Sequence, residues 1–594
     1  MGVAVNELEN GSFTQHVRDR LLAHGDDRFY AFVKEGTEDL VEERARYRDL
    51  DVEARSIAAW LASSAAPAGK PVLLLFPAGL DFLRAFLGCL YAGVIAVPAP
   101  VPTDPRSYRR VANIVADTGL ELVLTTSSLA DELRERLPER LSEGQLDVRA
   151  VDEDCAGTAD DWRMPPLDRD SVAFLQYTSG STSEPKGVVV TQGNLLHNEA
   201  EIASRLGMGD DLVLAGWLPH FHDMGLIGML LQPLYVGGDC VFMAPGTFLK
   251  RPVRWLQTIS RTRANVTVAP NFAYDMCVRT ITDEQLRELD LSSLKAVLNG
   301  AEPVRAKTLT DFSARFAPAG FRPEMFVPCY GMAEVTLLAA SVDVGAPVPI
   351  TQVNRTALEG GEIRHDDGEQ STSLVSCGVP STLDIRIVDP ATQVERAAGQ
   401  VGEIWVGGGS VAAGYWNRPE TNRDIFQAHT TDGDGPFLRT GDLGVLLDGH
   451  LYVTGRLKDV LILRGRNLYP QDIEYVIGEV HPSLAAGTGA VFSVDADGEH
   501  VVVLHEIKRG LLDGLTLDEL SGRVSVVVAR TFDIPAPSVV LTNRGVVQRT
   551  TSGKVQRSLM RELFLANAVK AVHESLRPAV RGLRAVPSTA GGTR

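Results

Sequence analysis

Short apolar segments alternate with helical patterns in the first part of the chain. Residues 71–76 (PVLLLF) form an apolar run of strand length, and residues 94–97 form another. Residues 52–61 and 81–91 carry apolar side chains at the spacing of a helix with one buried face. This order is typical of βαβ units, so it predicts a parallel sheet that is covered by helices on both faces.

The alternation continues to about residue 385 and then changes. Further strands are expected at residues 172–176, 188–190 and 266–269, whereas residues 384–453 show short alternating strands separated by glycine turns. Beyond Lys458 the chain has strands and helices of its own. We therefore predict an α/β protein: a large N-terminal domain of two α/β subdomains plus a β-rich subdomain, followed by a small mobile α+β C-terminal domain. The predicted boundaries are residues 1–457 for the large domain, about 378–457 for its β-rich subdomain, 458–574 for the C-terminal domain and 575–594 for a disordered tail.

Composition limits the partners and the compartment. The 594 residues include 58 basic and 76 acidic side chains, a net charge of −18, which argues against binding to nucleic acid. The six cysteines form no C-x-x-C pair, which favours isolated core thiols in a reducing compartment. The longest uncharged run, residues 85–101, contains glycine and proline and falls short of the ~20 residues that span a bilayer. We expect a cytoplasmic protein without a membrane span.

The segment from Tyr177 to Gly187 (YTSGSTSEPKG) is the strongest candidate for binding a ligand. It lies between two predicted strands and combines hydroxyl side chains, glycines and one lysine. Such a loop offers N–H groups, hydroxyls and a cation to a polyanion, and its glycines let the chain approach phosphate oxygens closely. The spacing is not that of a Walker A loop. A surface hairpin rich in serine and threonine is the alternative, but we favour phosphate binding.

Four further segments gain weight only in combination. In Tyr330–Glu334 (YGMAE) the glutamate suits the first turn of a helix expected over residues 334–340. In residues 439–444 (RTGDLG) Asp442 is expected in a turn between strands, where its carboxylate is either structural or accepts the hydroxyls of a ribose. The other two segments, which alone are typical of a basic surface, are residues 455–474 and 549–554 (RTTSGK).

Taken in order, these segments resemble the adenylate-forming superfamily of acyl-CoA synthetases, luciferases and adenylation domains. The resemblance covers about residues 171–563 and is nearest to the fatty acyl-AMP ligases. A polar, glycine-rich stretch at about residues 341–376 also looks like an insertion that these ligases carry and ordinary acyl-CoA synthetases lack. The stretches that carry the resemblance are residues 175–187 (LQYTSGSTSEPKG), 217–228 (WLPHFHDMGLIG), 330–334 and 464–474 (RGRNLYPQDIE).

The resemblance implies a role for each matching residue, with ATP and Mg²⁺ as cofactors. Glu334 is implied to position the metal, and Lys458 to lie at the hinge between domains. The implied catalytic residues are Lys554, Glu334 and His222, and the implied acyl-pocket residues are His222, Asp223 and Met224. The implied ATP and AMP contacts are Thr178, Ser179, Gly180, Ser181, Thr182, Lys186, Gly300, Ala301, Tyr330, Gly331, Met332, Asp442 and Arg456.

The implied activity has two steps. A fatty acid is activated by ATP to an acyl adenylate with release of pyrophosphate, and the acyl group then passes to the phosphopantetheine thiol of a separate acyl carrier protein or synthase carrier domain, as in lipopeptide or polyketide biosynthesis. The attacking carboxylate is already an anion, so the site must screen and align negative charges instead of generating a nucleophile. The alternatives are a fatty acyl-CoA synthetase, with CoA as acceptor, and a non-catalytic scaffold that keeps an adenylation-like fold for binding a synthase.

Two histidines in His220-Phe-His222-Asp223 also suggest a metal site or a catalytic triad. A protein metal site needs more ligands nearby, so we favour the acyl-pocket role for His222 and Asp223. The apolar run from Met224 to Leu234 is expected to be helix core and could form one wall of an acyl tunnel.

Overall fold

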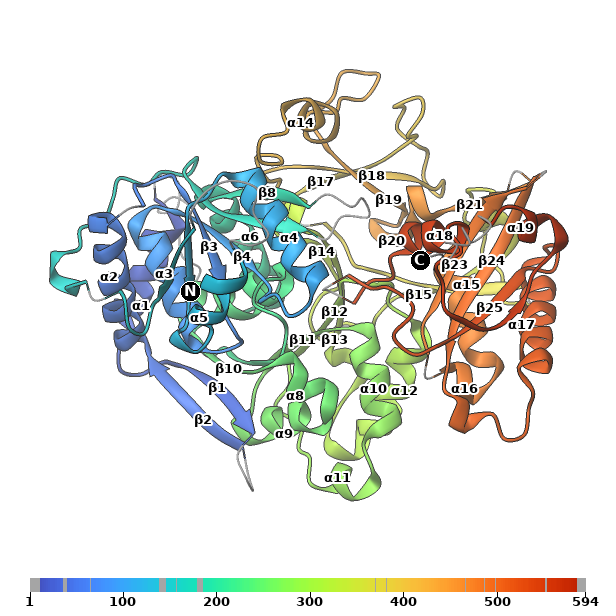
Figure 1. Ribbon diagram of the computed structural model, residues 1–594, viewed down its shortest axis with the longest axis horizontal. Coiled ribbons are helices and arrows are strands. Elements are labelled where there is room, and N and C mark those ends of the chain that lie inside the picture. The colour runs from blue at the N-terminus through green and yellow to red at the C-terminus, as the bar shows by residue number, and fades with distance from the viewer. Residues whose placement is uncertain are drawn as a thin grey trace, which may run out of the picture.

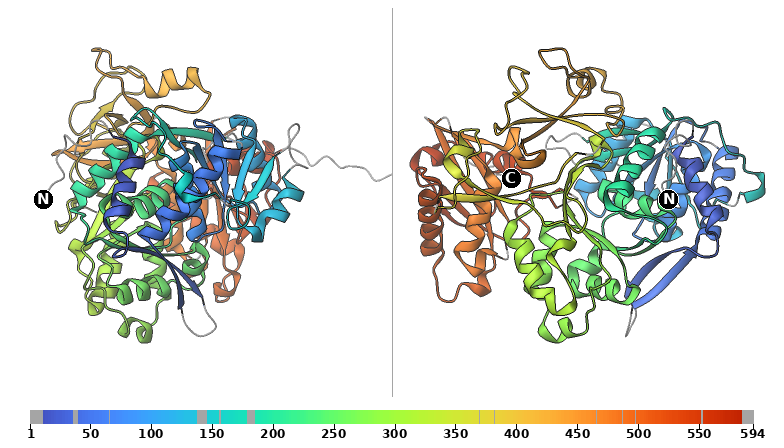
Figure 2. Two further views of the ribbon diagram at one scale, coloured as in Figure 1. Left: turned by 90° about the vertical axis from the view of Figure 1, so that its left-hand side faces the viewer. Right: turned by 180° about the vertical axis from the view of Figure 1, so that it is seen from behind.

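Two large sheets form the N-terminal part of the chain, and two four-stranded sheets follow them in the sequence (Figure 1). The architecture is α/β, with a large N-terminal domain and a small C-terminal domain, as the sequence predicts. The right-hand view of Figure 2 shows the orange and red C-terminal domain at the opposite end from the blue N-terminal segment. The computed structural model describes residues 11–35, 40–64, 66–137, 146–155, 157–178, 185–368, 370–380, 382–464, 466–485, 487–496, 498–550 and 553–584.

The first sheet has six strands in the order β6-β5-β3-β4-β7-β8. Strands β7 and β8 pair antiparallel, and the other neighbours pair in parallel. The apolar runs at residues 71–76 and 94–97 form β3 and β4, which confirms both predicted strands. The elements are β3 (Pro71–Leu75), β4 (Ile95–Ala99), β5 (Leu122–Thr125), β6 (Asp147–Ala150), β7 (Val172–Thr178), β8 (Lys186–Thr191), α2 (Tyr47–Ser64), α3 (Leu80–Ala92), α4 (Pro105–Thr118) and α5 (Ser127–Arg136).

The second sheet has eight strands in the order β14-β13-β12-β11-β9-β10-β1-β2, with antiparallel pairs at both edges. Helix α6 contacts β8 of the first sheet and β14 of the second, so it joins the two. The strands are β1 (Phe29–Glu35), β2 (Leu40–Arg46), β9 (Val213–Gly216), β10 (Asp239–Met243), β11 (Val266–Pro270), β12 (Ala296–Gly300), β13 (Phe326–Gly331) and β14 (Leu338–Ser341). The helices are α1 (Phe13–Ala23), α6 (Gln192–Leu206), the π-helix η4 (Met224–Leu231), α7 (Gln232–Val236), α8 (Pro245–Lys250), α9 (Val253–Thr262), α10 (Asn271–Thr280), α11 (Asp283–Arg287) and α12 (Ala306–Phe316).

The third sheet is antiparallel throughout and corresponds to the stretch of short strands and glycine turns in the sequence. Some of its side chains, such as those of Ile404 and Leu451, belong to the same large core as both preceding sheets. The β-rich unit is therefore packed on the large domain and is not independent of it. Its elements are β17 (Asp384–Val388), β18 (Gly402–Gly407), α14 (Pro419–Phe426), β19 (Leu438–Leu447) and β20 (His450–Arg456).

The C-terminal domain has apolar cores of its own on the two faces of the sheet β23-β24-β25-β26. One core gathers side chains such as Ile473 and Val528 from helices α15 and α17, and the other contains Met560 and Phe564 of α18. The elements are η8 (Leu457–Asp459), β21 (Leu461–Leu463), β22 (Arg466–Leu468), α15 (Pro470–Val480), α16 (Pro482–Ala485), β23 (Gly489–Asp495), β24 (Glu499–Ile507), α17 (Leu517–Phe532), β25 (Ser538–Asn543), α18 (Arg557–Leu565), β26 (Ala571–Ser575) and α19 (Pro578–Gly582).

The glycine-rich stretch at about residues 341–376 forms a small unit between the eight-stranded sheet and the β-rich sheet. Its two strands pair antiparallel, and a single helical turn lies between them in the sequence. We refer to residues 341–376 as the insertion. Its elements are β15 (Ile350–Asn354), α13 (Arg355–Glu359) and β16 (Ser371–Val375).

The prediction of a helix over residues 334–340 is wrong. Only a 3₁₀ turn, η7 (Ala333–Val335), is present, and the chain then forms the edge strand β14. All four residues of β14 are buried, and Asn198 exchanges two hydrogen bonds with the backbone of Leu338. Pairing with β13 thus overrides the local preference for a helix.

The prediction of a disordered tail from residue 575 onward is also wrong for residues 575–584. Residues Pro578–Gly582 form the short helix α19, whose Val580 is fully buried. Arg577 donates to the carbonyl of Ala536, and Arg584 pairs with Glu574 at 2.7 Å. One buried valine and two arginine contacts fix this segment, although its composition resembles that of a disordered end. Residues 585–594 lie outside the described residues.

Two expectations from composition can be compared with the structure. All six cysteines are free, and five of them are buried, which confirms the prediction of isolated core thiols. Within the described ranges, no helix combines the length and the apolar character needed to cross a bilayer.

Candidate active site

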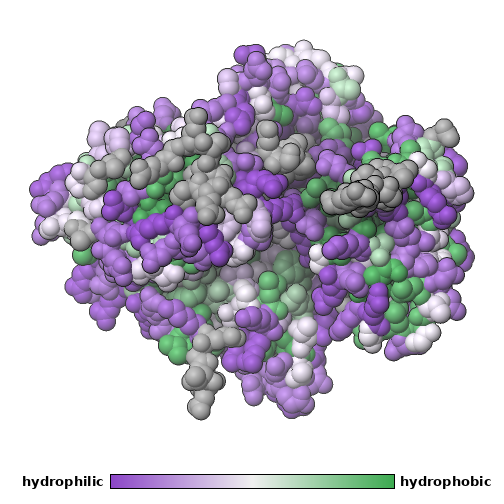
Figure 3. Space-filling view, viewed as in Figure 1, coloured by the Kyte–Doolittle hydropathy of each residue, from purple (hydrophilic) through white to green (hydrophobic). Residues whose placement is uncertain are grey.

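A cavity of about 1100 Å³ lies where the two α/β subdomains, the β-rich sheet and the C-terminal domain meet. Its lining includes residues at the ends of β7, β11, β12 and β13, where parallel strands of such folds commonly present ligand-binding side chains. The space-filling view shows this face hollowed between the large domain and the C-terminal domain (Figure 3). Most of the predicted site residues that the structure describes line this one cavity.

The ends of the predicted phosphate loop face the cavity. Thr178 ends β7, Lys186 begins β8, and the two residues are paired partners that both line the cavity. The Lys186 ammonium lies 5.0 Å from the centre of the Tyr415 ring, a cation–π contact that holds it against this wall. The remaining predicted members of the loop lie outside the described residues: Ser179, Gly180, Ser181 and Thr182.

Asp442 connects the β-rich sheet to the second α/β subdomain. The Tyr330 hydroxyl donates to Asp442 Oδ2 at 2.9 Å, and Arg456 Nε donates to Asp442 Oδ1 at 2.9 Å. Burial, reinforced by the Asp442 carboxylate, raises the pKa of Tyr330 well above its usual value. The Asp442 carboxylate likewise raises the pKa of Arg456. All three side chains line the cavity, so the structure brings together an aromatic ring, a carboxylate and a guanidinium.

The sequence suggested that Asp442 lies in a turn between strands, and this prediction is wrong. Asp442 belongs to strand β19, directly opposite Arg456 of β20. Gly441 before it has a φ of +70°, and the register shifts between Leu443 and Gly444. This irregularity interrupts an otherwise regular strand at the point where the carboxylate faces the cavity.

The turn after β12 and the end of β13 supply further predicted contacts. Ala301, Gly331 and Met332 line the cavity, whereas Gly300 lies behind them at the end of β12. A Cβ at Gly300 would lie 2.8 Å from Cys329 Sγ, so a larger residue would have to displace the Cys329 side chain. Gly300 therefore shapes this wall through its small size instead of lining the cavity.

Glu334 lies in η7, near Lys186. Tyr415 donates its hydroxyl to Glu334 Oε1 at 2.8 Å, which leaves the second carboxylate oxygen for another partner. The described residues contain no group of three or more His, Cys, Asp or Glu arranged to hold a metal. Mg²⁺ is commonly held by one or two carboxylates together with substrate phosphates and waters, so Glu334, which Tyr415 links to Lys186, fits this ion.

His222, Asp223 and Met224 stand at the start of η4, and all three line the cavity. His222 Nδ1 lies 2.6 Å from Asp223 Oδ1, and the backbone N–H of Met224 donates to the same oxygen. Burial opposes the charged form of Asp223, but the attraction of His222 and Lys554 outweighs it and lowers the pKa of this carboxyl. The pair is thus a negative charge held close to an imidazole.

His220 is not part of this group. Its ring is buried 4.0 Å from the Phe82 ring centre, and burial lowers its pKa to about 3. The two histidines therefore have different environments, which argues against a metal site built on the pair.

Part of the cavity lining, all of it in the large domain, is apolar, and we call this part the apolar arm. Met224 and Gly228 of η4 face this arm, while Leu226, Ile227, Leu230 and others of the same helix are fully buried in the core. The run from Met224 is thus both helix core, as predicted, and a wall of the cavity. Other apolar residues that line the cavity are Ile202, Met208, Leu214, Val266, Val268, Leu298, Leu337 and Leu338.

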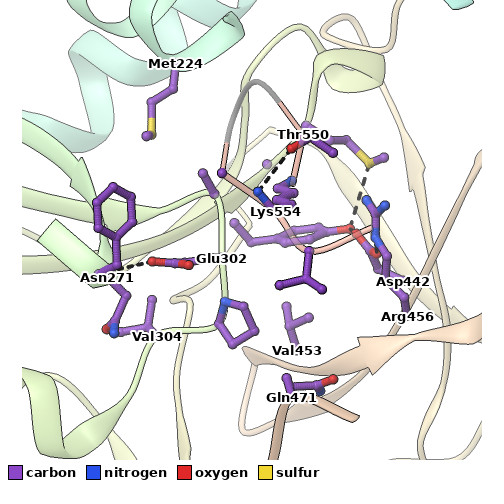
Figure 4. A pocket seen from close by; sticks show the side chains of 18 of the residues that line it. Met224, Asn271, Glu302, Val304, Asp442, Val453, Arg456, Gln471, Thr550 and Lys554 are labelled. Carbon is purple, nitrogen blue, oxygen red and sulfur yellow. Dashed lines mark hydrogen bonds and ion pairs between the residues drawn. The ribbon is translucent and has the colours of Figure 1, made fainter. Parts of the chain in front are cut away.

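Lys554 enters the cavity from the C-terminal domain. It follows a tight hairpin in which the Thr550 N–H donates to the Lys554 carbonyl at 2.7 Å. It lies in the same pocket as Asp442 and Arg456 (Figure 4), and its side chain is within electrostatic reach of these two residues and of Asp223 and Glu334. Enclosure by the cavity walls, and then repulsion by Arg456, lowers the pKa of Lys554, although the side chain remains open to the cavity itself.

The predicted hinge residue Lys458 lies in the 3₁₀ turn η8, directly after β20. Burial and the nearby Arg456 lower its pKa. A separate contact joins the domains close by, where Arg305 of the large domain forms an ion pair with Asp472 of α15 at 2.7 Å.

The insertion contacts the C-terminal domain through charged groups. Arg466 forms an ion pair with Glu359 of α13, whose side chain is 3% exposed. Arg355 donates to the carbonyl of Thr531 at 2.8 Å and lies 5.3 Å from the centre of the Phe532 ring. The insertion is therefore bound to helix α17 and to the β21–β22 hairpin of the C-terminal domain.

Sequence reasoning missed two polar side chains of the cavity. Glu302 accepts the backbone N–H of Phe272 at 2.6 Å, and burial raises its pKa (Figure 4). It lies next to Ala301, so its position beside a predicted contact was a usable signal. Tyr415, which binds Glu334, lies 81 residues further along the chain and offers no such local signal.

Comparisons with known proteins are consistent with this geometry. Residues 23–416 match the AMP-binding enzyme family. The chain is 43% identical to the medium-chain-fatty-acid–[acyl-carrier-protein] ligase JamA of Moorena producens over 90% of this chain and 92% of that protein. It is 33% identical to the ligase TtuA of Teredinibacter turnerae, named for the same activity, over 95% and 96% of the two chains. A solved fatty acyl-adenylate ligase from L. pneumophila, in complex with acyl adenylate and pyrophosphate, has a TM-score of 0.75 at 36% identity and covers 97% of this chain and 99% of its own.

Proposed function

The chain belongs to the AMP-binding enzyme family, and we propose that within it the protein is a fatty acyl-AMP ligase that serves an acyl carrier protein. It activates a fatty acid with ATP to the acyl adenylate, releases pyrophosphate, and transfers the acyl group to the phosphopantetheine thiol of a separate carrier. The observation that carries the proposal is the convergence of Lys186, Glu334, Asp442 and Lys554 on one cavity that continues into an apolar arm.

The nucleotide is held by the wall opposite the apolar arm. Tyr330 offers its ring to the adenine, and Asp442 offers its carboxylate to the ribose hydroxyls. Arg456 orients Asp442 and adds positive charge near the ribose and the α-phosphate. The strand ends and the phosphate loop from Thr178 to Lys186 receive the triphosphate.

The acyl chain occupies the apolar arm, so its carboxylate emerges near His222 and the phosphates. Two anions must then meet, because the carboxylate attacks the α-phosphorus in line while pyrophosphate leaves. Lys554 lies where it can screen this approach and stabilise charge on the phosphoryl oxygens, without acting as a base. Mg²⁺, when bound beside Glu334, supplies further positive charge to the phosphate oxygens.

The acceptor is assigned from the contact between the insertion and the C-terminal domain. Transfer of the acyl group requires the hairpin of Lys554 to withdraw, so that a thiol can reach the mixed anhydride. We assign the hinge of this motion to Lys458. The ion pair of Arg466 with the buried Glu359 restrains a large rotation of the domain, and this restraint disfavours free CoA as acceptor.

We propose that the protein is cytoplasmic, and its thiols support this. All six cysteines are free, which fits a reducing cytoplasm, where a carrier protein and ATP are both available.

The test is an acceptor competition with purified protein. ATP, Mg²⁺ and octanoate or laurate are supplied with either CoA or a phosphopantetheine-bearing carrier protein, and the acyl products are separated by chromatography. We expect acyl-AMP to accumulate with CoA and to be consumed with the carrier. Abundant acyl-CoA would favour the acyl-CoA synthetase alternative, and absence of any adenylate would favour the non-catalytic scaffold.

A further inference from the structure

We propose that Arg106 is a positioning residue that clamps the Lys554 hairpin over the cavity during adenylate formation. This inference rests on the proposed function but concerns a residue to which neither the motifs nor the proposed chemistry gives a role. Arg106 lies in the first turn of α4, in the large domain, more than 440 positions from the hairpin in the sequence.

Arg106 binds the side chains of two glutamines, Gln548 and Gln556, which lie on either side of the hairpin. Arg106 Nη1 donates to Gln548 Oε1 at 2.5 Å, and Nη2 donates to Gln556 Oε1 at 2.8 Å. The backbone N–H of Gln556 donates to the Gln548 carbonyl at 3.0 Å, so the two glutamines face each other across the base of the hairpin. One guanidinium thus spans both sides of the element that carries Lys554.

The groups on both sides of the contact are themselves fixed. Asp104 caps α4 by accepting the N–H groups of Arg106 and Ser107, which sets the position of the first turn. The residues Pro98, Ala99 and Pro100 that lead into α4 line the cavity, so the base of the clamp belongs to the cavity wall. Gln548 donates its amide N–H to the Val546 carbonyl at 3.1 Å, which turns its oxygen toward Arg106.

The chemistry of the acceptors makes the clamp reversible. Both acceptors are neutral amides, and Arg106 is exposed to solvent, so the contact is weaker than an ion pair of the same geometry. Such a contact orders the hairpin while Lys554 is needed and costs little to break when the thiol must enter. The bidentate geometry explains the need for arginine, since one lysine ammonium cannot present two donors in a fixed fork.

The two half-reactions should therefore respond differently to loss of the clamp. Adenylate formation is measured as pyrophosphate release with ATP and laurate, and transfer is measured with preformed lauroyl-AMP and a phosphopantetheine-bearing carrier protein. Arg106→Ala should lower kcat of the first reaction about tenfold, the size expected for two exposed hydrogen bonds to a cation, with KM for laurate unchanged. It should leave transfer unchanged or faster.

Two further substitutions test the geometry. Arg106→Lys should restore only part of the adenylation rate. Gln548→Glu should strengthen the clamp by turning one of its hydrogen bonds into an ion pair, and should slow transfer several-fold without slowing adenylation. Gln548 is chosen because Gln556 lines the cavity, where a new carboxylate would repel ATP.

Arg109→Ala is the matched control, because Arg109 is exposed on the same helix. It should match the wild type in both half-reactions, and thermal unfolding should show both alanine variants folded. Equal rates of adenylation for Arg106→Ala and the wild type would overturn the clamp, as would an equal loss in both half-reactions. If the wild type itself forms no adenylate, the proposed function fails instead.

Discussion

Two of the contacts through which the large domain holds the C-terminal domain differ in their chemistry. At the insertion, Arg466 pairs with Glu359, a carboxylate that is almost fully buried. At the cavity, Arg106 binds the neutral side chains of Gln548 and Gln556 in an exposed position. The first contact joins a partly exposed cation to a carboxylate buried from water, and the second joins a cation to amides in water.

The difference indicates which contact yields during the catalytic cycle. Removing one partner of a buried ion pair leaves an unpaired charge and is costly, whereas an exposed hydrogen bond is readily replaced by water. The hairpin can therefore leave the cavity while the domain stays attached at the insertion. A short movement of this kind suits a thiol carried on a flexible phosphopantetheine arm.

The largest effect is expected from Lys554→Ala. Because Lys554 is the mobile cation that screens the two reacting anions, its loss should lower adenylate formation by about 10²- to 10³-fold. ATP binding, measured by calorimetry, should change little, since Asp442 and the phosphate loop remain. A rate close to that of the wild type would show that the hairpin contact does not serve catalysis.

Breaking the insertion contact should have the next largest effect. Glu359→Ala removes the buried partner of Arg466 and leaves it only the exposed Asp533, at 3.8 Å, as a carboxylate partner. The substitution should lower the free energy of unfolding by about 2 kcal/mol, measured by denaturant titration. It should also raise acyl-CoA formation, because the C-terminal domain gains freedom. Glu362→Ala, in the same insertion but with a half-exposed side chain, is the control and should do neither. Unchanged acceptor preference in Glu359→Ala would contradict the assigned restraint.

The rate of adenylation should also fall at alkaline pH. The pKa of Lys554 is lowered from its usual value near 10.5, and only the protonated form is a cation. The rate should therefore be full below the lowered pKa and fall as the pH rises through it, at a pH below 10.5. Lys554→Arg should move this fall to higher pH. A pH–rate profile of kcat that is flat up to pH 10.5 would argue against a role for the Lys554 charge.

A smaller effect is expected from Tyr415→Phe. The substitution removes the hydroxyl that donates to Glu334 but keeps the ring beneath Lys186. The Mg²⁺ concentration needed for half-maximal rate should rise about three- to tenfold, since one hydrogen bond to a carboxylate is lost. An unchanged Mg²⁺ requirement in Tyr415→Phe would show that the Tyr415 hydroxyl does not support metal binding.

Much of the fold was predictable because its strands are short apolar runs. Residues 71–76 and 94–97 could be assigned from pattern alone, since buried parallel strands leave no polar face. The edge strand β14 could not, because its helix-like sequence is overridden by pairing with β13 and by Asn198. The end of the C-terminal domain was missed for a similar reason, because it is fixed by one buried valine, Val580, and by two arginine contacts.

The candidate site was predictable where its residues form local motifs. Segments such as residues 330–334 and 549–554 carry recognisable spacing, and the structure brings their side chains into one cavity. Tyr415 and Arg106 stand outside any motif and act through partners 81 and more than 440 positions away. Contacts of that separation are set by the packing of domains, which no local pattern encodes.

The most direct test of the account measures both half-reactions in Lys554→Ala by rapid quench. In one arm the enzyme receives ATP, Mg²⁺ and laurate, and in the other it receives preformed lauroyl-AMP and a phosphopantetheine-bearing carrier protein. We expect the first reaction to be nearly abolished while acyl transfer proceeds close to the wild-type rate. An equal loss of both reactions would contradict it, because Lys554 would then be needed at a stage when its hairpin should have left the cavity.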